Sequence, residues 1–267
     1  MSALTTPATL VVQGFLSYKA LAWSGIAAYA WNRLARPILF VTMFAIMGRF
    51  VGDPVAAEAY IVGMAAAAIP ATILDGILPS FSFERNAATL PFLFVSRANR
   101  IALLWARGSF HLVNSWASGA ISLLFAWSVL RLDFSRVDWV TMATSMVVIS
   151  WSCTAFALFA GNFSLLLRGY NDLSTFLQGS MVAFTGAVIP LSVLPPPAVV
   201  VGQALPFTAG LVAFRAAFAG ASLDMVGGSL ATEAIVGLAY AGLAALFFAR
   251  LEMQAKRRGS LSWEAAA

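Results

Sequence analysis

Asp75 is an acidic residue inside a long apolar segment of the sequence. At the rise of an α-helix it lies about 13 Å before Glu84, where the chain becomes polar. Ionisable side chains within a membrane-spanning segment are costly and usually serve a function. Asp75 is therefore a candidate for lining a substrate path or a seam between subunits. The alternative is a structural acid, neutral or hydrogen-bonded to a neighbouring helix.

Further along the chain, His111, Asn114 and Ser115 share one face of a predicted helix because they are three and four residues apart. They are further candidates for the same path, although polar faces of this kind more often hold helices together. Arg215 stands in an apolar stretch broken by Pro and Gly. It is a candidate for binding an anionic head group, or for extending its charge to the membrane surface.

The sequence gives little basis for catalysis or metal binding. Cys153 is the single cysteine and His111 the single histidine. An intramolecular disulfide and a cysteine-based metal site are therefore excluded, and a histidine-based site would have to use His111 alone, so we expect no catalytic residues and no metal. Neither Lys19 nor Lys256 follows a glycine-rich loop of the Walker A type. This chain is therefore expected to bind no cofactor, and any ATP and Mg²⁺ would be bound by another chain.

Composition points to a membrane protein. Hydrophobic residues make up 61% of the chain and charged residues 10%, against about 45–50% and about 25% in soluble domains. The net charge of +5 arises from residues at the ends of apolar segments. That placement indicates orientation in a membrane rather than binding to nucleic acid.

The apolar segments predict an all-α integral membrane protein with a single domain over residues 1–267. The predicted spans are about 33–50, 59–83, 101–130, 139–166, 173–194 and 230–248. Residues 13–32, rich in Trp and Tyr and interrupted by Lys19, predict an interfacial helix. Residues 198–222 are apolar but broken, and predict re-entrant helices in the outer leaflet.

Charge asymmetry predicts the orientation of these six spans. All sixteen Lys and Arg residues fall on the side of both termini except Arg49, Arg131, Arg136 and Arg215. The positive-inside rule therefore places both termini in the cytoplasm. Six acids, Glu233 among them, are assigned to the opposite loops. The N-terminal residues lack the pattern of a signal peptide.

The polar segment 84–100 is too charged to span a membrane. It predicts a short amphipathic helix on the cytoplasmic side, with apolar contacts from Phe92 to Phe94. This helix either seats in a groove of a cytoplasmic partner or is a connecting loop with anchoring charges.

Within that segment, Glu84-Arg85-Asn86-Ala87-Ala88-Thr89-Leu90, followed by Val95-Ser96-Arg97-Ala98-Asn99-Arg100, resembles the signature between the second and third spans of ABC-2 type exporter permeases. Arg97 stands where the family commonly has Pro. Residues 33–48, 190–195, 205–208 and 214–215 resemble other stretches of the same family, in the same order. The resemblance covers essentially the whole chain.

The resemblance implies a bacterial plasma-membrane subunit that exports an amphipathic or lipid-like substrate. Two permeases, identical or related, work in membrane lipid with two cytoplasmic ATPase subunits. Residues 13–32 would be the family's interface helix. The segment that couples to the ATPase would contain Glu84, Arg85, Asn86, Thr89, Leu90, Arg97 and Arg100.

Other functions remain open on the sequence alone. Within the same family, the substrate could be a polysaccharide on a lipid carrier. A secondary transporter or channel would use Asp75 and His111 as a proton relay. An intramembrane enzyme would require paired acids or a histidine cluster within the spans. A purely structural membrane subunit would require neither.

Overall fold

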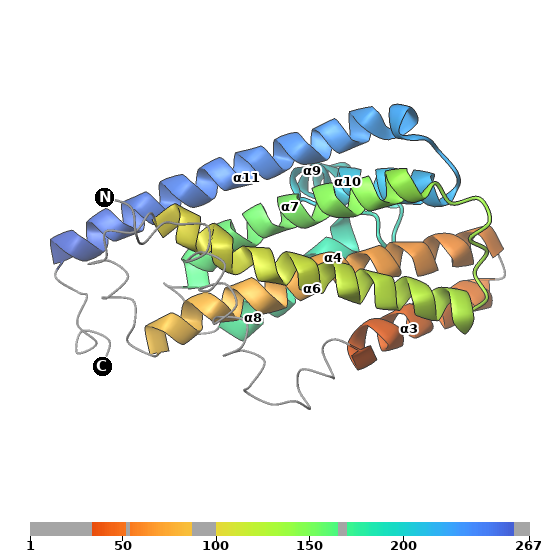
Figure 1. The fold of residues 1–267 in the computed structure, drawn as a ribbon, viewed down its shortest axis with the longest axis horizontal. Helices are drawn as coiled ribbons and strands as arrows, with labels where there is room; N and C mark the ends of the chain where they lie inside the picture. The colour runs from red at the N-terminus through yellow and green to blue at the C-terminus, as the bar shows by residue number, and fades with distance from the viewer. Residues whose placement is uncertain (1–33, 52–53, 87–99, 165–169, 259–267) are drawn as a thin grey trace.

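The computed structural model describes residues 34–51, 54–86, 100–164 and 170–258, and in these residues all regular secondary structure is helical (Figure 1). The predicted all-α class is therefore confirmed. The predicted interfacial helix at 13–32 lies outside the described residues. The helices are α3 (Arg36–Val51), α4 (Pro54–Asn86), α6 (Arg100–Ser128), α7 (Trp139–Ser164), α8 (Tyr170–Phe184), η2 (Leu191–Val193), α9 (Pro196–Ala204), α10 (Thr208–Phe218) and α11 (Leu223–Arg258).

Three of these helices are long and apolar enough to cross a membrane: Ala57–Pro79 in α4, Trp139–Phe163 in α7 and Leu223–Phe248 in α11. About 20 apolar residues suffice for that crossing, and a helix satisfies all its backbone hydrogen bonds internally. The pair α9 and α10 also qualifies when taken together, but it is bent by 84°. These features are those of a helical membrane protein.

The central helix is α4. Of its most apolar stretch 83% is buried, against 22% for α11. Its buried face carries Ile69, Ile73, Leu74 and Leu78, and it packs against α3, α6, α7, α8 and α10. The helix continues through Pro70 and Pro79. Side chains on α4 can therefore meet side chains from most of the molecule.

Contacts between helices fix their directions. Asp75 on α4 contacts Ser174 on α8, and Gly63 on α4 meets Ala187 just after α8, so α4 and α8 are antiparallel. In contrast, α7 and α11 run in the same direction, because Ser152 meets Glu233 and Asn162 meets Ala244.

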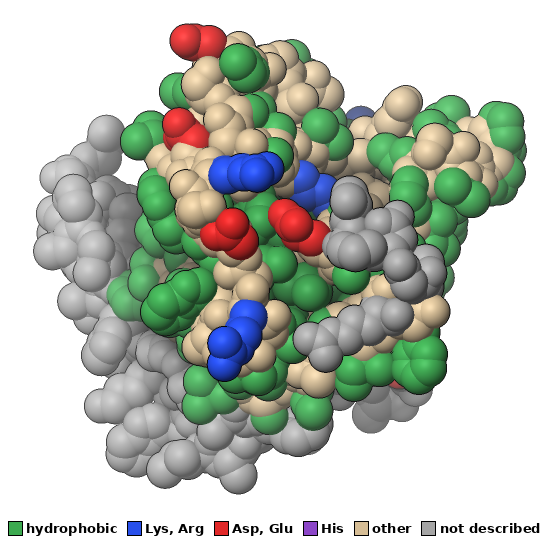
Figure 2. Space-filling model, turned by 90° about the vertical axis from the view of Figure 1, so that its right-hand side faces the viewer, with side chains coloured by type: hydrophobic (Ala, Val, Ile, Leu, Met, Phe, Trp, Pro, Cys, Tyr) green, Lys and Arg blue, Asp and Glu red, His purple; other side chains and the backbone are tan. Residues whose placement is uncertain are grey.

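As a result the molecule has two distinct ends. The C-terminal ends of α4, α7 and α11 gather at the left of Figure 1. The loop 129–138 and the beginnings of α4 and α11 lie at the right, and Figure 2 views that end, where acidic and basic side chains are mixed among apolar ones.

Two predicted spans differ from the helices. The predicted span 173–194 is wrong in its second half, because α8 ends at Phe184. Gly186 has a φ of +85°, and the carbonyls of Gly186 and Ala187 accept hydrogen bonds from Arg215 rather than continuing the helix. Pro190 and Pro195 follow, and proline cannot donate the backbone bond that a continuing helix needs.

The second difference concerns the last span, predicted at 230–248. Helix α11 begins earlier, at Leu223, with Asp224 in its first turn, and extends to Arg258. An acid suits the positive end of a helix dipole. Glu233 therefore lies inside α11 and is only 1% exposed. Its assignment to an external loop was wrong.

Candidate functional site

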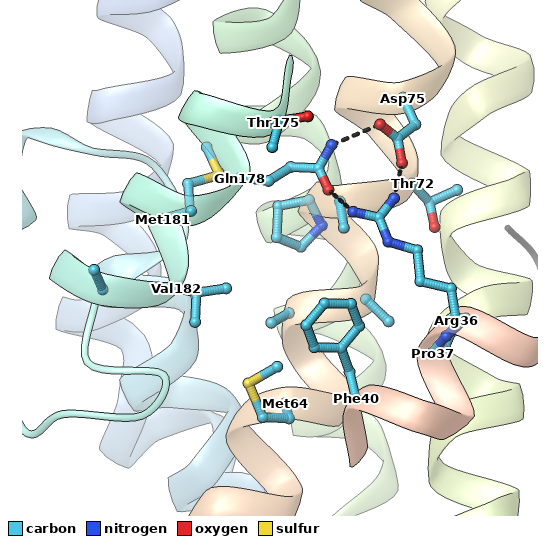
Figure 3. A pocket seen from close by; sticks show the side chains of 16 residues that line it. Arg36, Pro37, Phe40, Met64, Thr72, Asp75, Thr175, Gln178, Met181 and Val182 are labelled. Carbon is cyan, nitrogen blue, oxygen red and sulfur yellow. Dashed lines mark hydrogen bonds and ion pairs between the residues drawn. The ribbon is translucent and has the colours of Figure 1, made fainter. Parts of the chain in front are cut away.

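A cavity of about 300 Å³ lies between α3, α4 and α8 (Figure 3). Small residues on α4 and α8, Ala67, Ala68, Ala71 and Gly179, line it and leave the space. Larger apolar side chains complete the walls: Phe40, Met64, Met181 and Val182. Its volume is at the lower end of the range for small-molecule sites, and its mostly apolar lining is typical of them.

The polar end of this pocket is built by one side chain from each helix. Arg36 from α3 forms an ion pair with Asp75 from α4 through Nη1 and Oδ2. Its Nη2 donates to the side-chain oxygen of Gln178 from α8 at 2.5 Å. Figure 3 shows the three side chains converging from three ribbons. The two charged side chains are partly exposed, 29% for Arg36 and 31% for Asp75.

Helix α8 supplies a second layer of hydrogen bonds. Ser174 and Gln178 are four residues apart and therefore share a face of the helix. The Gln178 amide donates to Asp75 Oδ1 at 2.6 Å and to the Ser174 hydroxyl at 2.9 Å. The Ser174 hydroxyl donates to the same Asp75 oxygen at 3.0 Å. The carboxylate thus accepts three hydrogen bonds, which fix its position.

Arg36 is also oriented by its own helix. Its guanidinium carbon lies 5.8 Å from the ring centroid of Phe40, one turn further on. A guanidinium over an aromatic face at this distance makes a cation–π interaction. Phe40 therefore links the charged end of the pocket to its apolar wall.

The arrangement can bind a ligand through charge, hydrogen bonds and apolar contacts. Its groups are an arginine, a carboxylate, an amide and hydroxyls, of which none is an activated nucleophile. In the part of the chain that the structure describes, no three His, Cys, Asp or Glu side chains come together to hold a metal ion. What the pocket offers is an apolar volume closed at one end by polar groups.

Among the predicted path residues, the structure brings Asp75 alone into the pocket. His111 is 3% exposed and its ring packs against Gly76, so close that a Cβ there would meet it at 2.0 Å. Ser115 is buried beside Ser150, with 3.5 Å between their hydroxyl oxygens. Asn114 is half-buried on the same helix. These residues lie at the seam of α4, α6 and α7 rather than in a common path with Asp75.

Arg215 also lies away from the pocket. Its guanidinium donates to the carbonyls of Gly186, Ala187 and Ala59 at 2.8 to 3.0 Å. Instead of reaching outward to a head group or the membrane surface, it ties α10 to the end of α8 and the beginning of α4.

The predicted coupling residues are described only in part. Glu84, Arg85 and Asn86 form the last turn of α4, and Arg100 opens α6. Thr89, Leu90 and Arg97 lie outside the described residues.

Neither a scan against protein-family models nor a search of curated proteins finds a match for this chain. Function is therefore inferred from the geometry of the chain and from the resemblance of its sequence.

Sequence reasoning missed three residues of the pocket's polar end: Arg36, Ser174 and Gln178. Arg36 was taken as one of the charges that flank a span. The signal that could have revealed Ser174 and Gln178 is their spacing, because two polar residues four apart inside an apolar segment form one polar face. No sequence pattern pairs that face with Asp75, which is 99 residues from Ser174.

A second polar cluster was also missed. The Glu233 carboxylate accepts hydrogen bonds from the backbone of Phe207 at 2.6 Å, from the backbone of Gly210 at 2.9 Å and from the Ser152 hydroxyl. Ser152 lies on α7, and the two backbone donors lie at the beginning of α10, where Phe207 has a φ of +86°. A helix N-terminus carries unsatisfied N–H groups and partial positive charge, so a carboxylate stabilises it. Glu233 holds the bend between α9 and α10 in place.

Proposed function

We propose that this chain is the membrane permease subunit of an ATP-driven exporter of the ABC-2 type. It moves an amphipathic or lipid-like molecule, such as a drug, an antibiotic or a lipid, out of the cytoplasm or the inner leaflet. Separate ATPase subunits bind ATP and Mg²⁺, and a second permease, identical or related, completes the complex.

The observation that carries this proposal is the continuity of α4. Met64 to Asp75 line the pocket, and the same helix runs without a break to Glu84, Arg85 and Asn86. The helix is about 50 Å long, whereas the apolar core of a bilayer is about 30 Å thick. Its apolar part ends at Pro79. A push on the polar end of α4 would therefore reach the pocket along one continuous helix.

The pocket supports an amphipathic substrate because it joins an apolar volume to a polar end. A space of about 300 Å³ holds a head group with part of a tail. It is too small for a polysaccharide chain, which makes that alternative the weaker one.

We further propose six crossings, by α3, α4, α6, α7, α8 and α11, with α9 and α10 re-entrant. Helix α10 begins beside Glu233, which is ten residues into α11. It ends beside Asp138, at the end of the molecule that carries the loop 129–138. It therefore runs from inside the helical body back to the end where α11 begins. That course supports a re-entrant pair rather than a separate crossing.

A gradient-driven transporter that uses Asp75 and His111 is less well supported. Asp75 is ion-paired with Arg36 on α3 and accepts two further hydrogen bonds from side chains on α8, whereas His111 belongs to α6. His111 packs against Gly76, on another face of α4 from Asp75.

The test is co-purification from the native cell in a mild detergent, followed by mass spectrometry. We expect a P-loop ATPase to come with the wild-type chain and to be lost from the double variant Glu84→Ala/Arg85→Ala. The matched control is Asp133→Ala/Arg136→Ala, which removes an acid and a base from the opposite end, where both side chains are exposed. This control should retain the ATPase.

Reconstituted vesicles provide the decisive measurement. The complex should export a fluorescent amphipath only when ATP is present. Transport by the chain alone under a proton gradient, without ATP, would refute the proposal.

A further inference from the structure

We propose that the pocket between α3, α4 and α8 selects amphipaths whose polar head is uncharged and rich in hydrogen-bond acceptors, such as an amide, an ester or a ketone. The physiological meaning of this selectivity rests on the exporter function proposed above. Binding itself can be measured without transport or ATP.

Charge balance is the first reason. Among the described residues that line the pocket, Arg36 and Asp75 are the two that carry charge, and they neutralise each other. A ligand with a charged head would leave one net charge in an otherwise apolar cavity, and such a charge is costly in a membrane. A neutral head adds no net charge.

The count of hydrogen-bonding groups is the second reason. A guanidinium has five N–H donors, of which Arg36 uses one for Asp75 and one for Gln178. Both hydrogens of the Gln178 amide are used, for Asp75 and Ser174. The carboxylate of Asp75 accepts three hydrogen bonds, so little acceptor capacity remains. The spare groups of the pocket are therefore mainly donors, and they favour a ligand that accepts.

The remaining walls define the other half of the ligand. Phe40, Met64, Met181 and Val182 give apolar contacts, and methionine adapts to tails of different shape. Phe40 is 41% exposed, and Thr175 and Gly179 are exposed as well. The pocket is thus open on the side where α3 and α8 face outward.

Photo-crosslinking of the purified chain in lipid nanodiscs tests the proposal. Three probes share a decyl chain with a diazirine and differ in their heads, which are an N-methyl amide, a carboxylate and a trimethylammonium. Labelling of residues 178–183 is measured by peptide mass spectrometry. It is divided by labelling of Leu238 on α11, which is 62% exposed and reports the amount of probe in the bilayer.

The amide probe should label the pocket at least about tenfold more than either charged probe, because an uncompensated charge costs more than 1.4 kcal/mol there. Excess decyl amide without a diazirine should abolish this labelling. Equal or stronger labelling by the carboxylate or the ammonium probe would overturn the proposed ligand class.

Two variants make the test sharper. A Cβ at Gly179 meets nothing within 4 Å, so Gly179→Leu should fill the pocket without a backbone clash and remove the labelling. Gly242→Leu on α11 is the matched control, with the same free space and no part in the pocket, and should keep it. Persistent labelling in Gly179→Leu would show that the probe binds elsewhere.

Asp75→Asn tests the charge argument directly. It leaves Arg36 without its counter-ion, so the preference should shift from the amide to the carboxylate probe. An unchanged preference would refute the argument. A chain that shows the selectivity but co-purifies with no ATPase would disprove the exporter function and leave the ligand class standing.

Discussion

Asp75 and Glu233 are acids set among apolar helices, and each is stabilised by different chemistry. Asp75 has the guanidinium of Arg36 and stays partly exposed. Among the described residues, the partners of the Glu233 carboxylate are a hydroxyl and the backbone N–H groups that open α10, with no cation, and Glu233 is 1% exposed. Asp75 can therefore meet a ligand, whereas Glu233 serves the fold.

Replacing Glu233 tests that structural role. Glu233→Gln keeps the shape of the side chain but replaces one of its two acceptor oxygens with an amide N–H₂ group. That group is a donor and would face N–H donors of the backbone. We expect a loss of about 1–3 kcal/mol in stability, the cost of a buried donor left unsatisfied. The measurement is the thermal unfolding midpoint of the purified chain in detergent.

Glu58→Gln is the control, because Glu58 is exposed near the beginning of α4. It should leave the midpoint where it is in the wild type. If both variants unfold at the same temperature, the Glu233 bonds contribute no measurable stability.

At the scale of elements, the bent pair α9 and α10 is fastened at two points. Glu233 holds the beginning of α10, and Arg215 near its end holds the turn after α8 and the beginning of α4. The close approach of Arg215 and Ala187 to α4 depends on Gly63, where a Cβ would lie 2.3 Å from Arg215 Nη2 and 2.4 Å from the Ala187 oxygen.

Gly63→Ala should therefore lower stability by about 1–3 kcal/mol, the usual cost of forcing extra atoms into a packed site. Gly179→Ala has free space around its Cβ and should be neutral or slightly stabilising, because alanine favours a helix. Chemical denaturation of both variants in the same detergent gives the comparison. A smaller loss of stability in Gly63→Ala than in Gly179→Ala would contradict the close packing around Gly63.

The start of α7 provides a pH-dependent element. The backbone N–H of Thr141 donates to Asp138 Oδ1 at 2.8 Å and lowers the pKa of that carboxyl below its ordinary value. Since the folded pKa is the lower one, the carboxylate stabilises the fold above the unfolded pKa, and this contribution is lost as the pH falls through the folded pKa.

Asp138→Asn keeps an acceptor for the cap but does not titrate. The drop in unfolding midpoint between about pH 7 and about pH 3 should therefore be smaller in this variant than in the wild type. An equal drop in both proteins would show that the cap does not sense pH.

For the whole molecule, the sequence predicted the helical class because composition and apolar length act locally. Asp75 was singled out for the same reason, since an acid in an apolar segment can be recognised from the sequence alone. Its partners were not, because Arg36 and Gln178 are 39 and 103 residues away from it in the chain. Glu233 was misplaced because its backbone partners at the beginning of α10 lie 26 and 23 residues earlier in the chain, a pairing that no sequence pattern shows.

The proposed orientation can be tested with thiol labelling because Cys153 is fully buried and gives little background. Ser135→Cys lies in the exposed loop before α7, and Arg250→Cys lies near the far end of α11. A maleimide that cannot cross membranes should label Ser135→Cys on intact cells, and Arg250→Cys only after permeabilisation. The reverse pattern would invert the topology.

The open side of the pocket, between the outward faces of α3 and α8, has a consequence for how affinity is measured. Phe40 and Gly179 lie on this side, within the apolar layer of the proposed six-span topology. A ligand there equilibrates with the bilayer, so its mole fraction in lipid determines occupancy, and its aqueous concentration matters only through partitioning. Apparent dissociation constants expressed per volume of buffer will rise with the lipid-to-protein ratio, whereas those expressed per lipid will stay constant.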